Sequence, residues 1–161
     1  MKLTKKALLY DISNLAYLIA DTGEESRHTL HRVRDICEDG NIDRVSRLLG
    51  LAFTEILDIL KPIVESPAMD VNHDFTAVPR DYEIKFRKET KLSSVVRMRI
   101  KETAREYMVS RVLADWLSLT LPETAEIWKT RLGLSMQLLK ETAAAAAAEG
   151  YSVMKRRVSP I

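Results

Sequence analysis

The chain is poor in several residue types, and each scarcity excludes a class of protein. A single cysteine, Cys37, occurs among the 161 residues, so no disulfide can form within the chain, and zinc motifs with two or four cysteines are excluded. The five glycines are scattered singly, which leaves no glycine-rich phosphate-binding loop. No apolar run approaches the roughly 18 residues of a membrane span. We therefore expect a cytoplasmic protein without a membrane segment.

Charge of either sign is not in excess. The 25 lysines and arginines nearly balance 23 aspartates and glutamates, leaving a formal net charge of +2. This balance gives no overall attraction to nucleic acid or anionic membranes. Apolar residues at 46% and charged residues at 30% are typical of a globular protein, and the length fits one domain. Met1 to Tyr10 begins like a secretory signal, but Asp11 interrupts its apolar run, so we expect no signal peptide.

Apolar residues at steps of three and four predict three helices before Pro62. Thr4 can cap the first, which ends near Gly23, and the second spans about Ser26 to Glu38. The third begins at Asn41 or Asp43 and has a continuous apolar face. That face runs straight through Gly50, so one unbroken core helix is favoured over a helix-turn-helix bent at this glycine. Its members are Ile42, Val45, Leu48, Leu49, Ala52, Phe53, Ile56, Ile59, Leu60 and Ile63.

The helical pattern stops between residues 64 and 91. From Tyr82 to Arg87 apolar and charged residues alternate, which predicts a short strand with Tyr82, Ile84 and Phe86 on one face. A lone strand leaves backbone donors and acceptors unpaired, so it needs a partner. The other plausible extended segment is the tail that begins at Tyr151. We expect the strand to pair with that tail or with another copy of the chain.

Two long helices are predicted in the rest of the chain. The fourth runs from Ser93 or Ser94 to Thr120, and the fifth begins at Pro122 and ends at Gly150. Its apolar face is Ile127, Trp128, Leu132, Met136 and Leu139. The sequence therefore predicts a mainly α protein: a bundle of about five helices in one domain over residues 1–150, with a short strand or ribbon in the connection at about 64–91. An extended basic tail is predicted over residues 151–161.

Small and aromatic residues suggest how the last two helices pack. Trp116 and Trp128 flank the joint before Pro122, and we expect both in the core where the helices fold back on each other. The six alanines from Ala143 to Ala148 favour helix and expose only methyl groups. Two interpretations stay open for this run: a surface that another helix approaches closely, or a helix end without a partner.

Two groups of residues are weak candidates for chemistry. Glu24, His28, His31 and Asp35 share one side of the second helix and are all metal-ligand types. The apolar residues lie on the opposite side, so this cluster is expected to face water without the supporting shell of a metal site. The pair His73-Asp74 lies in the irregular connection without a nucleophile pattern nearby. We predict no catalytic residue, no metal and no cofactor.

A stripe of basic residues is the best candidate for an interaction surface. Arg97, Lys101 and Arg105 follow one another at four-residue steps, and Arg111 falls near the same side of the fourth helix. Together with Lys155, Arg156 and Arg157 in the tail, the stripe is suited to phosphate or to an acidic neighbouring subunit. The alternative is an ordinary solvated helix face.

Part of the chain resembles a known group of proteins. Ala104 to Met108, followed by Asp115 to Leu117 and Leu121 to Trp128, resembles a pattern in small helical proteins of tailed phages and prophages of gut bacteria. Among these it is similar to head-to-tail adaptors, also called neck or connector proteins, which form rings beneath the portal. The resemblance covers about Thr103 to Ile161 and transfers no functional residue. It implies a homo-oligomer, a lumen for DNA, portal or tail proteins as partners, and no enzymatic activity.

Three functional hypotheses follow. The first is a non-enzymatic structural subunit of a phage or phage-like assembly, a ring-forming connector incorporated into the virion, because neighbouring subunits can supply strand partners and cover exposed ends. The second is a cytoplasmic helical binding module that contacts nucleic acid, without sequence specificity, or an acidic protein through the basic stripe. The third is a metalloprotein or enzyme that uses the face of His28 and His31.

Overall fold

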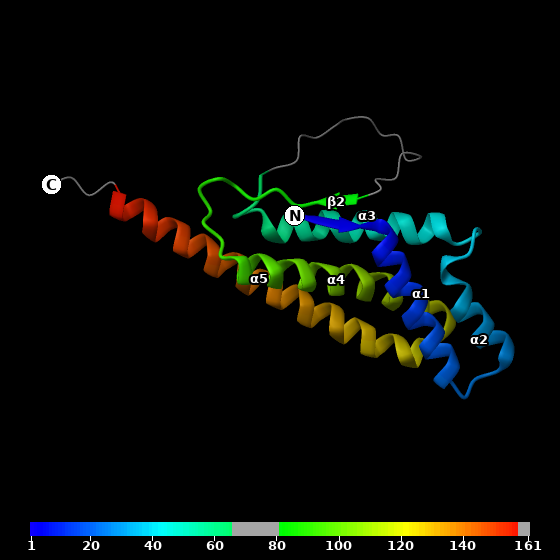
Figure 1. Ribbon diagram of the computed structural model, residues 1–161. Coiled ribbons are helices and arrows are strands. Elements are labelled where there is room, and N and C mark those ends of the chain that lie inside the picture. The colour runs from blue at the N-terminus through cyan, green and yellow to red at the C-terminus, as the bar shows by residue number, and fades with distance from the viewer. Residues whose placement is uncertain (66–80, 158–161) are drawn as a thin grey trace.

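The computed structural model of the protein describes residues 1–65 and 81–157, and the side chains of residues 1–65 and 81–149. Five α-helices and two short strands make up this part of the chain, as the predicted mainly α class requires (Figure 1). A short 3-10 turn, Asp35–Cys37, follows the second helix. The elements are β1 (Lys2–Thr4), α1 (Lys5–Thr22), α2 (Arg27–Arg34), α3 (Ile42–Leu60), β2 (Asp81–Glu83), α4 (Ser94–Thr120) and α5 (Pro122–Arg157).

Hydroxyl side chains begin three of the helices. Thr4, Ser26 and Ser93 each accept a hydrogen bond from a backbone N–H in the first turn, and each thereby satisfies a donor that the helix itself leaves unpaired. Asn41 precedes α3 but its side chain donates instead to the carbonyl of Asp35, at 2.9 Å. As predicted, α3 continues unbroken through Gly50.

The α4–α5 hairpin is the framework of the bundle. Leu121 alone joins the two antiparallel helices, and its N–H donates to the carbonyl of Leu117 at 2.7 Å. Pro122 can begin α5 because the first turn of a helix needs no N–H at that position. Trp116 and Trp128 are both buried on either side of the joint, which confirms their predicted place in the core.

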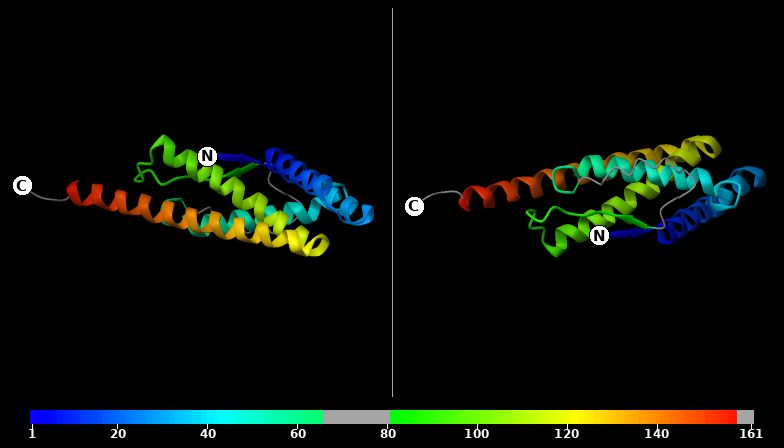
Figure 2. Two further views of the ribbon diagram at one scale, coloured as in Figure 1. Left: turned by 90° about the horizontal axis from the view of Figure 1, so that it is seen from below. Right: turned by 90° about the horizontal axis from the view of Figure 1, so that it is seen from above.

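The core lies between this hairpin and the first half of the chain. Helix α3 lies along α4 and α5, while α1 crosses α4 and is covered at its far end by α2 (Figure 1). The buried side chains come from every layer and include Ile12, Ile36, Ile56, Ile100 and Met108. The molecule is consequently elongated along the hairpin, as the two views of Figure 2 show.

The predicted strand is present, but its predicted partner is wrong. Tyr82 pairs with Leu3 in an antiparallel ribbon of β2 and β1. The backbone N–H of Ile84 donates to the carbonyl of Met1, and Phe86 forms a bridge with Val64. The chain start and the residues after α3 therefore hold the segment within one copy. Three residues are too few for β1 to show an alternating pattern, so the sequence gives no sign of this partner.

The ribbon packs on α3 with the alternation that the sequence predicts. Tyr82 and Ile84 are buried and Phe86 is half-buried, while the charged residues between them are exposed. The Tyr82 ring lies against Phe53, with 5.1 Å between the ring centroids. This contact attaches the ribbon to the bundle, which a two-stranded ribbon needs for stability.

The predicted extended tail is also wrong over the residues described. Helix α5 passes through Gly150 and ends at Arg157, so Lys155, Arg156 and Arg157 form its last turn, and residues 158–161 lie outside the described residues. One glycine costs a helix only about 1 kcal/mol, and the preceding alanines are the strongest helix formers. The single domain predicted over residues 1–150 therefore ends inside a helix.

Helix α5 extends past the bundle. It has 36 residues and its antiparallel neighbour α4 has 27, so α5 is longer by roughly 13 Å at about 1.5 Å per residue. The last turns of α5 project beyond all other helices in each view of Figures 1 and 2. The basic last turn of α5 thus lies away from the body of the bundle.

Candidate interaction surfaces

The structure divides the predicted basic stripe. Arg105 donates two hydrogen bonds to the carboxylate of Asp11 on α1, at 2.6 and 2.8 Å, and these bonds raise the pKa of the guanidinium. Arg111 lies 3.6 Å from the carboxylate of Glu55 on α3. Both arginines therefore serve contacts between helices of the same chain, and their charges are neutralised there.

The other two stripe residues are exposed. The guanidinium of Arg97 lies over the ring of Phe86, with 5.8 Å to the centroid. Lys101 is exposed and makes no ion pair with the residues that the structure describes. Arg97 and Lys101 thus form a patch only one helical turn long, which is much less than the stripe that spacing alone predicts.

The predicted surface is also divided in space. Lys155, Arg156 and Arg157 lie on the projecting end of α5, beyond the first turn of α4 (Figure 1). The four stripe residues all lie on α4, within the length of the bundle. The candidate surface therefore consists of two separate basic regions.

The predicted cluster of Glu24, His28, His31 and Asp35 is only partly assembled, and Glu24 and Asp35 lie before and after α2. Nδ1 of His31 lies 2.7 Å from Oδ2 of Asp35, and this hydrogen bond with the nearby negative charge raises the pKa of His31. Glu24 and His28 are exposed. Over residues 1–65 and 81–157, no three side chains of His, Cys, Asp or Glu converge as a metal site requires. His73 and Asp74 lie outside the described residues.

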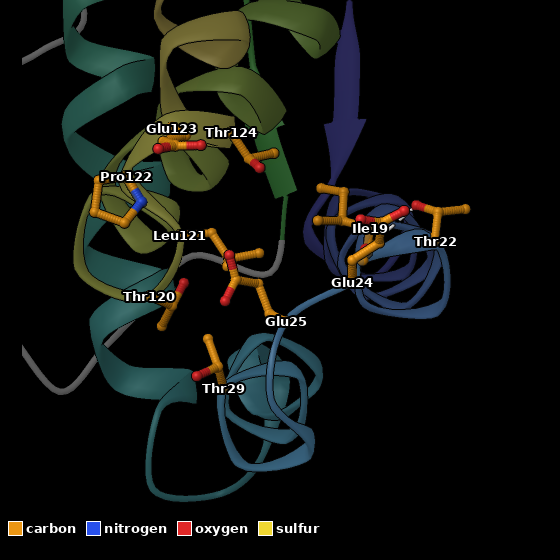
Figure 3. Close-up of a pocket in the computed structure, with 11 residues that line it drawn as sticks. Ile19, Thr22, Glu24, Glu25, Thr29, Thr120, Leu121, Pro122, Glu123 and Thr124 are labelled. Carbon is orange, nitrogen blue, oxygen red and sulfur yellow. Dashed lines mark hydrogen bonds between the residues drawn. The ribbon is translucent and has the colours of Figure 1, made fainter.

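A cleft at one end of the bundle has no counterpart in the sequence reasoning. It has a volume of about 590 Å³ and lies between the turn that joins α1 to α2 and the joint of α4 and α5 (Figure 3). The side chain of Glu25, from the turn between α1 and α2, points toward Leu121 at the joint of α4 and α5. Glu123 lies on the α5 side of the cleft and Glu24 on the α1 side. Segments about 100 residues apart form the cleft, and no local motif indicates such a pairing.

The chemistry that this cleft can offer is limited. The hydroxyls of Thr22 and Thr120 donate to backbone carbonyls of their own helices, and that of Thr29 is hydrogen-bonded to Ser26. Among its lining residues there is no imidazole, thiol or amine to act as a base or nucleophile. The arrangement is that of an acidic surface depression lined by Glu24, Glu25 and Glu123.

The outer side of α5 carries apolar side chains that face solvent. Ile127 is 60% exposed, Leu134 63% and Leu138 40%, and Ala145 is also exposed. We call Ile127, Leu134, Leu138 and Ala145 the α5 stripe. The sequence analysis placed Ile127 on the same apolar face as Trp128, and this is wrong, because Trp128 is buried whereas Ile127 faces solvent. In the sequence, the α5 stripe could have been recognised from the steps of seven, four and seven residues between its apolar members, which place them on one side of a helix.

The residues that carry the phage resemblance lie mainly in the core. Ala104, Met108, Leu117 and Ala125 have no exposed surface. Asp115, which is half-buried, accepts a hydrogen bond of 2.7 Å from Arg44 on α3. The resemblance therefore concerns the packing of the hairpin, and it identifies no surface through which the protein acts.

Comparisons with known proteins leave the family open. No family model, no curated protein and no solved structure matches this chain. Within the described ranges, none of the helices combines the length and the apolar character that crossing a bilayer requires.

Proposed function

We propose that this protein is a non-enzymatic structural subunit that acts as a homo-oligomer. The α5 stripe is the observation that carries the proposal. Large apolar side chains that are aligned along one exposed helix face, and not scattered singly, mark a surface that another protein covers. The projecting end of α5 supports the same proposal, because no other helix that the structure describes extends beside it, and a helix draws most of its stability from tertiary packing.

The surfaces inside the bundle support a structural role. Arg105 and Arg111, which a phosphate-binding function would need free, each bridge two helices. The acidic cleft pairs no nucleophile with a base among its lining residues. Most charged contacts between helices, such as Arg44 with Asp115, hold the framework together.

For the particular assembly we propose the ring-forming head-to-tail connector of a tailed phage. This part rests on the resemblance over Thr103 to Ile161, and its partners would be portal or tail proteins. The two parts are separable: self-association rests on the α5 stripe, whereas the phage assignment rests on the resemblance.

Light scattering on the purified full chain tests the first part. The expected result is a mass of two or more copies that rises with protein concentration, because the association is reversible. A single-copy mass up to the highest concentration reached would contradict the proposal. For the second part, mass spectrometry of particles from the source phage or prophage is expected to detect the chain in stoichiometric amount, and its absence from particles would remove the phage assignment.

A further inference from the structure

We propose that two copies of the chain pair through their α5 stripes, with the two helices antiparallel and related by a two-fold axis. This inference rests on the proposed homo-oligomer and adds its surface, its partner and its orientation. A two-fold contact joins copies in pairs; ring closure would need a different contact elsewhere on the subunit.

The spacing of the α5 stripe suits a helical partner. Ile127, Leu134, Leu138 and Ala145 follow one another at steps of seven, four and seven, which keeps them in line along one side of an α-helix. Ala148, about 60° from the centre of the α5 stripe, is exposed as well. The methyl groups of the exposed alanines allow a second helix to approach closely. In the middle of the α5 stripe, Leu134 and Leu138 are the large side chains that such a helix would cover.

The charges beside the α5 stripe are acidic. At about 100° per residue, Glu123 and Glu141 lie about 40° from its centre, whereas Lys129 and Lys140 lie on the far flank. Arg131 borders the α5 stripe but turns toward α4, where it lies 3.7 Å from Glu106 and covers the ring of Trp128. The described part of this surface therefore presents apolar side chains with carboxylates beside them.

Basic residues that complement these carboxylates occur at the other end of the same helix. The last turn contains Lys155, Arg156 and Arg157, and the first turn contains Glu123. Glu126, in contrast, lies about 100° from the centre of the α5 stripe and is paired with Lys129 at 2.6 Å. An antiparallel partner places its basic last turn beside Glu123, and two-fold symmetry makes this contact twice. A parallel partner would place carboxylates beside carboxylates.

Full overlap of the two helices matches Leu134 with a small residue and places Leu138 opposite Glu141 of the second copy. With Pro122 opposite Arg157, Leu134 lies opposite Ala145 of the second copy. The projecting end of each α5 then lies along the beginning of the other. Two helices of 36 residues, about 54 Å long, bury on the order of 1,000 Å² in total, which is near the lower limit for a specific interface and predicts reversible pairing.

The location of the contact is tested by sedimentation equilibrium with the full chain. Leu134→Glu is expected to weaken association at least about tenfold, since it places two carboxylates in the contact. The matched control is Leu51→Glu on α3, where the side chain is 57% exposed and the same charge is introduced. It is expected to leave association unchanged, and circular dichroism checks that both variants remain folded.

The orientation is tested with charge reversal. Glu123→Lys is expected to weaken pairing about tenfold. Adding Arg156→Glu, which lies opposite residue 123 in this register, is expected to restore it, because the ion pair reforms with opposite polarity. Weakening without restoration would contradict the antiparallel arrangement.

The outcomes separate this inference from the proposed function. If the unmodified chain associates and Leu134→Glu does not weaken it, the homo-oligomer stands and the α5 contact is wrong. If the unmodified chain is a single copy at every concentration, both are wrong.

Discussion

Helices α4 and α5 are neighbours of similar composition, yet they occupy different positions in the molecule. Twelve of the 27 residues of α4 are buried, because α1, α3, α5 and β1 all contact it. Only seven of the 28 residues of α5 whose side chains are described are buried, on the one side that faces α4 and α3. Both helices have apolar residues around much of their circumference. The same kind of sequence pattern therefore accompanies a central helix in α4 and a helix with one solvent-facing side in α5, and we propose that a second copy covers that side.

The largest effect should come from truncating an equivalent leucine in each helix. Leu113→Ala in α4 removes a fully buried side chain and is expected to lower the free energy of unfolding by about 3 kcal/mol. Leu134→Ala in α5 removes an exposed one, with an expected change within about 0.5 kcal/mol. Denaturant titration at low protein concentration measures both. Equal losses would abolish the distinction between the two helices.

Alkaline pH should weaken the core around α3 and α4. Burial raises the pKa of Tyr82 to about 12, and burial with the hydrogen bond to Glu55 raises that of Tyr107. A tyrosine with a raised pKa in the folded state contributes stability that is present below the unfolded value near 10 and is lost as the pH rises through the folded value.

The free energy of unfolding, measured between pH 9 and pH 12, is therefore expected to fall in the native chain. Tyr82→Phe should flatten that decline, since the phenol that titrates is gone. Tyr10→Phe is the matched control, because Tyr10 is 70% exposed, and it should leave the decline unchanged. An equal effect of the two substitutions would contradict the burial of Tyr82.

A smaller loss of stability is expected from breaking the ion pair between Arg105 on α4 and Asp11 on α1. Asp11→Asn removes the charge that Arg105 pairs with and should lower the free energy of unfolding by about 1 kcal/mol. Glu102→Gln is the control, since its carboxylate is 3.9 Å from Arg105 and more exposed. Retention of the chain on immobilised DNA at low salt should increase for Asp11→Asn. No change in either measurement would indicate that the Arg105 bridge has no role.

The sequence predicts the helices well and the contacts between distant segments poorly. The effects of Thr4, Ser93 and Pro122 on where helices begin are local. Each acts within one helical turn, so the neighbouring sequence is enough to predict it. The pairing of Tyr82 with Leu3 depends on a ribbon that closes across the whole first half of the chain. The residues next to Leu3 and Tyr82 in the sequence do not indicate that the two segments pair.

The errors at the surface have the same cause. The four-residue steps from Arg97 to Arg105 correctly place these residues on one side of α4, but the presence of Asp11 opposite Arg105 depends on how α1 crosses that helix. Ile127 is apolar and adjacent to a core tryptophan, yet it is exposed, because adjacent residues of a helix point about 100° apart and Trp128 takes the side that faces the core. Gly150 fails to end α5 because the alanine run before it outweighs its cost.

The smallest effect concerns an exposed residue at the end of the molecule. The hydrogen bond and charge of Asp35 raise the pKa of His31, so this contact stabilises the fold below the ordinary value near 6.5 and the contribution is lost as the pH rises. In a titration followed by NMR, Asp35→Asn is expected to lower the His31 pKa toward that value, while Glu24→Gln leaves it unchanged. A His31 pKa that does not respond to Asp35→Asn would contradict the contact.

Disulfide cross-linking between α5 helices tests whether two copies of the chain pair antiparallel through this helix. In a chain with Cys37→Ala, one preparation carries Leu134→Cys and a second carries Ala145→Cys; a disulfide requires Cβ atoms about 4 Å apart. If the helices pair antiparallel, a mixture of the two preparations is expected to form disulfide-linked dimers faster than either preparation alone. Faster cross-linking within each separate preparation, or no dimer in the mixture, would contradict the antiparallel pairing of α5.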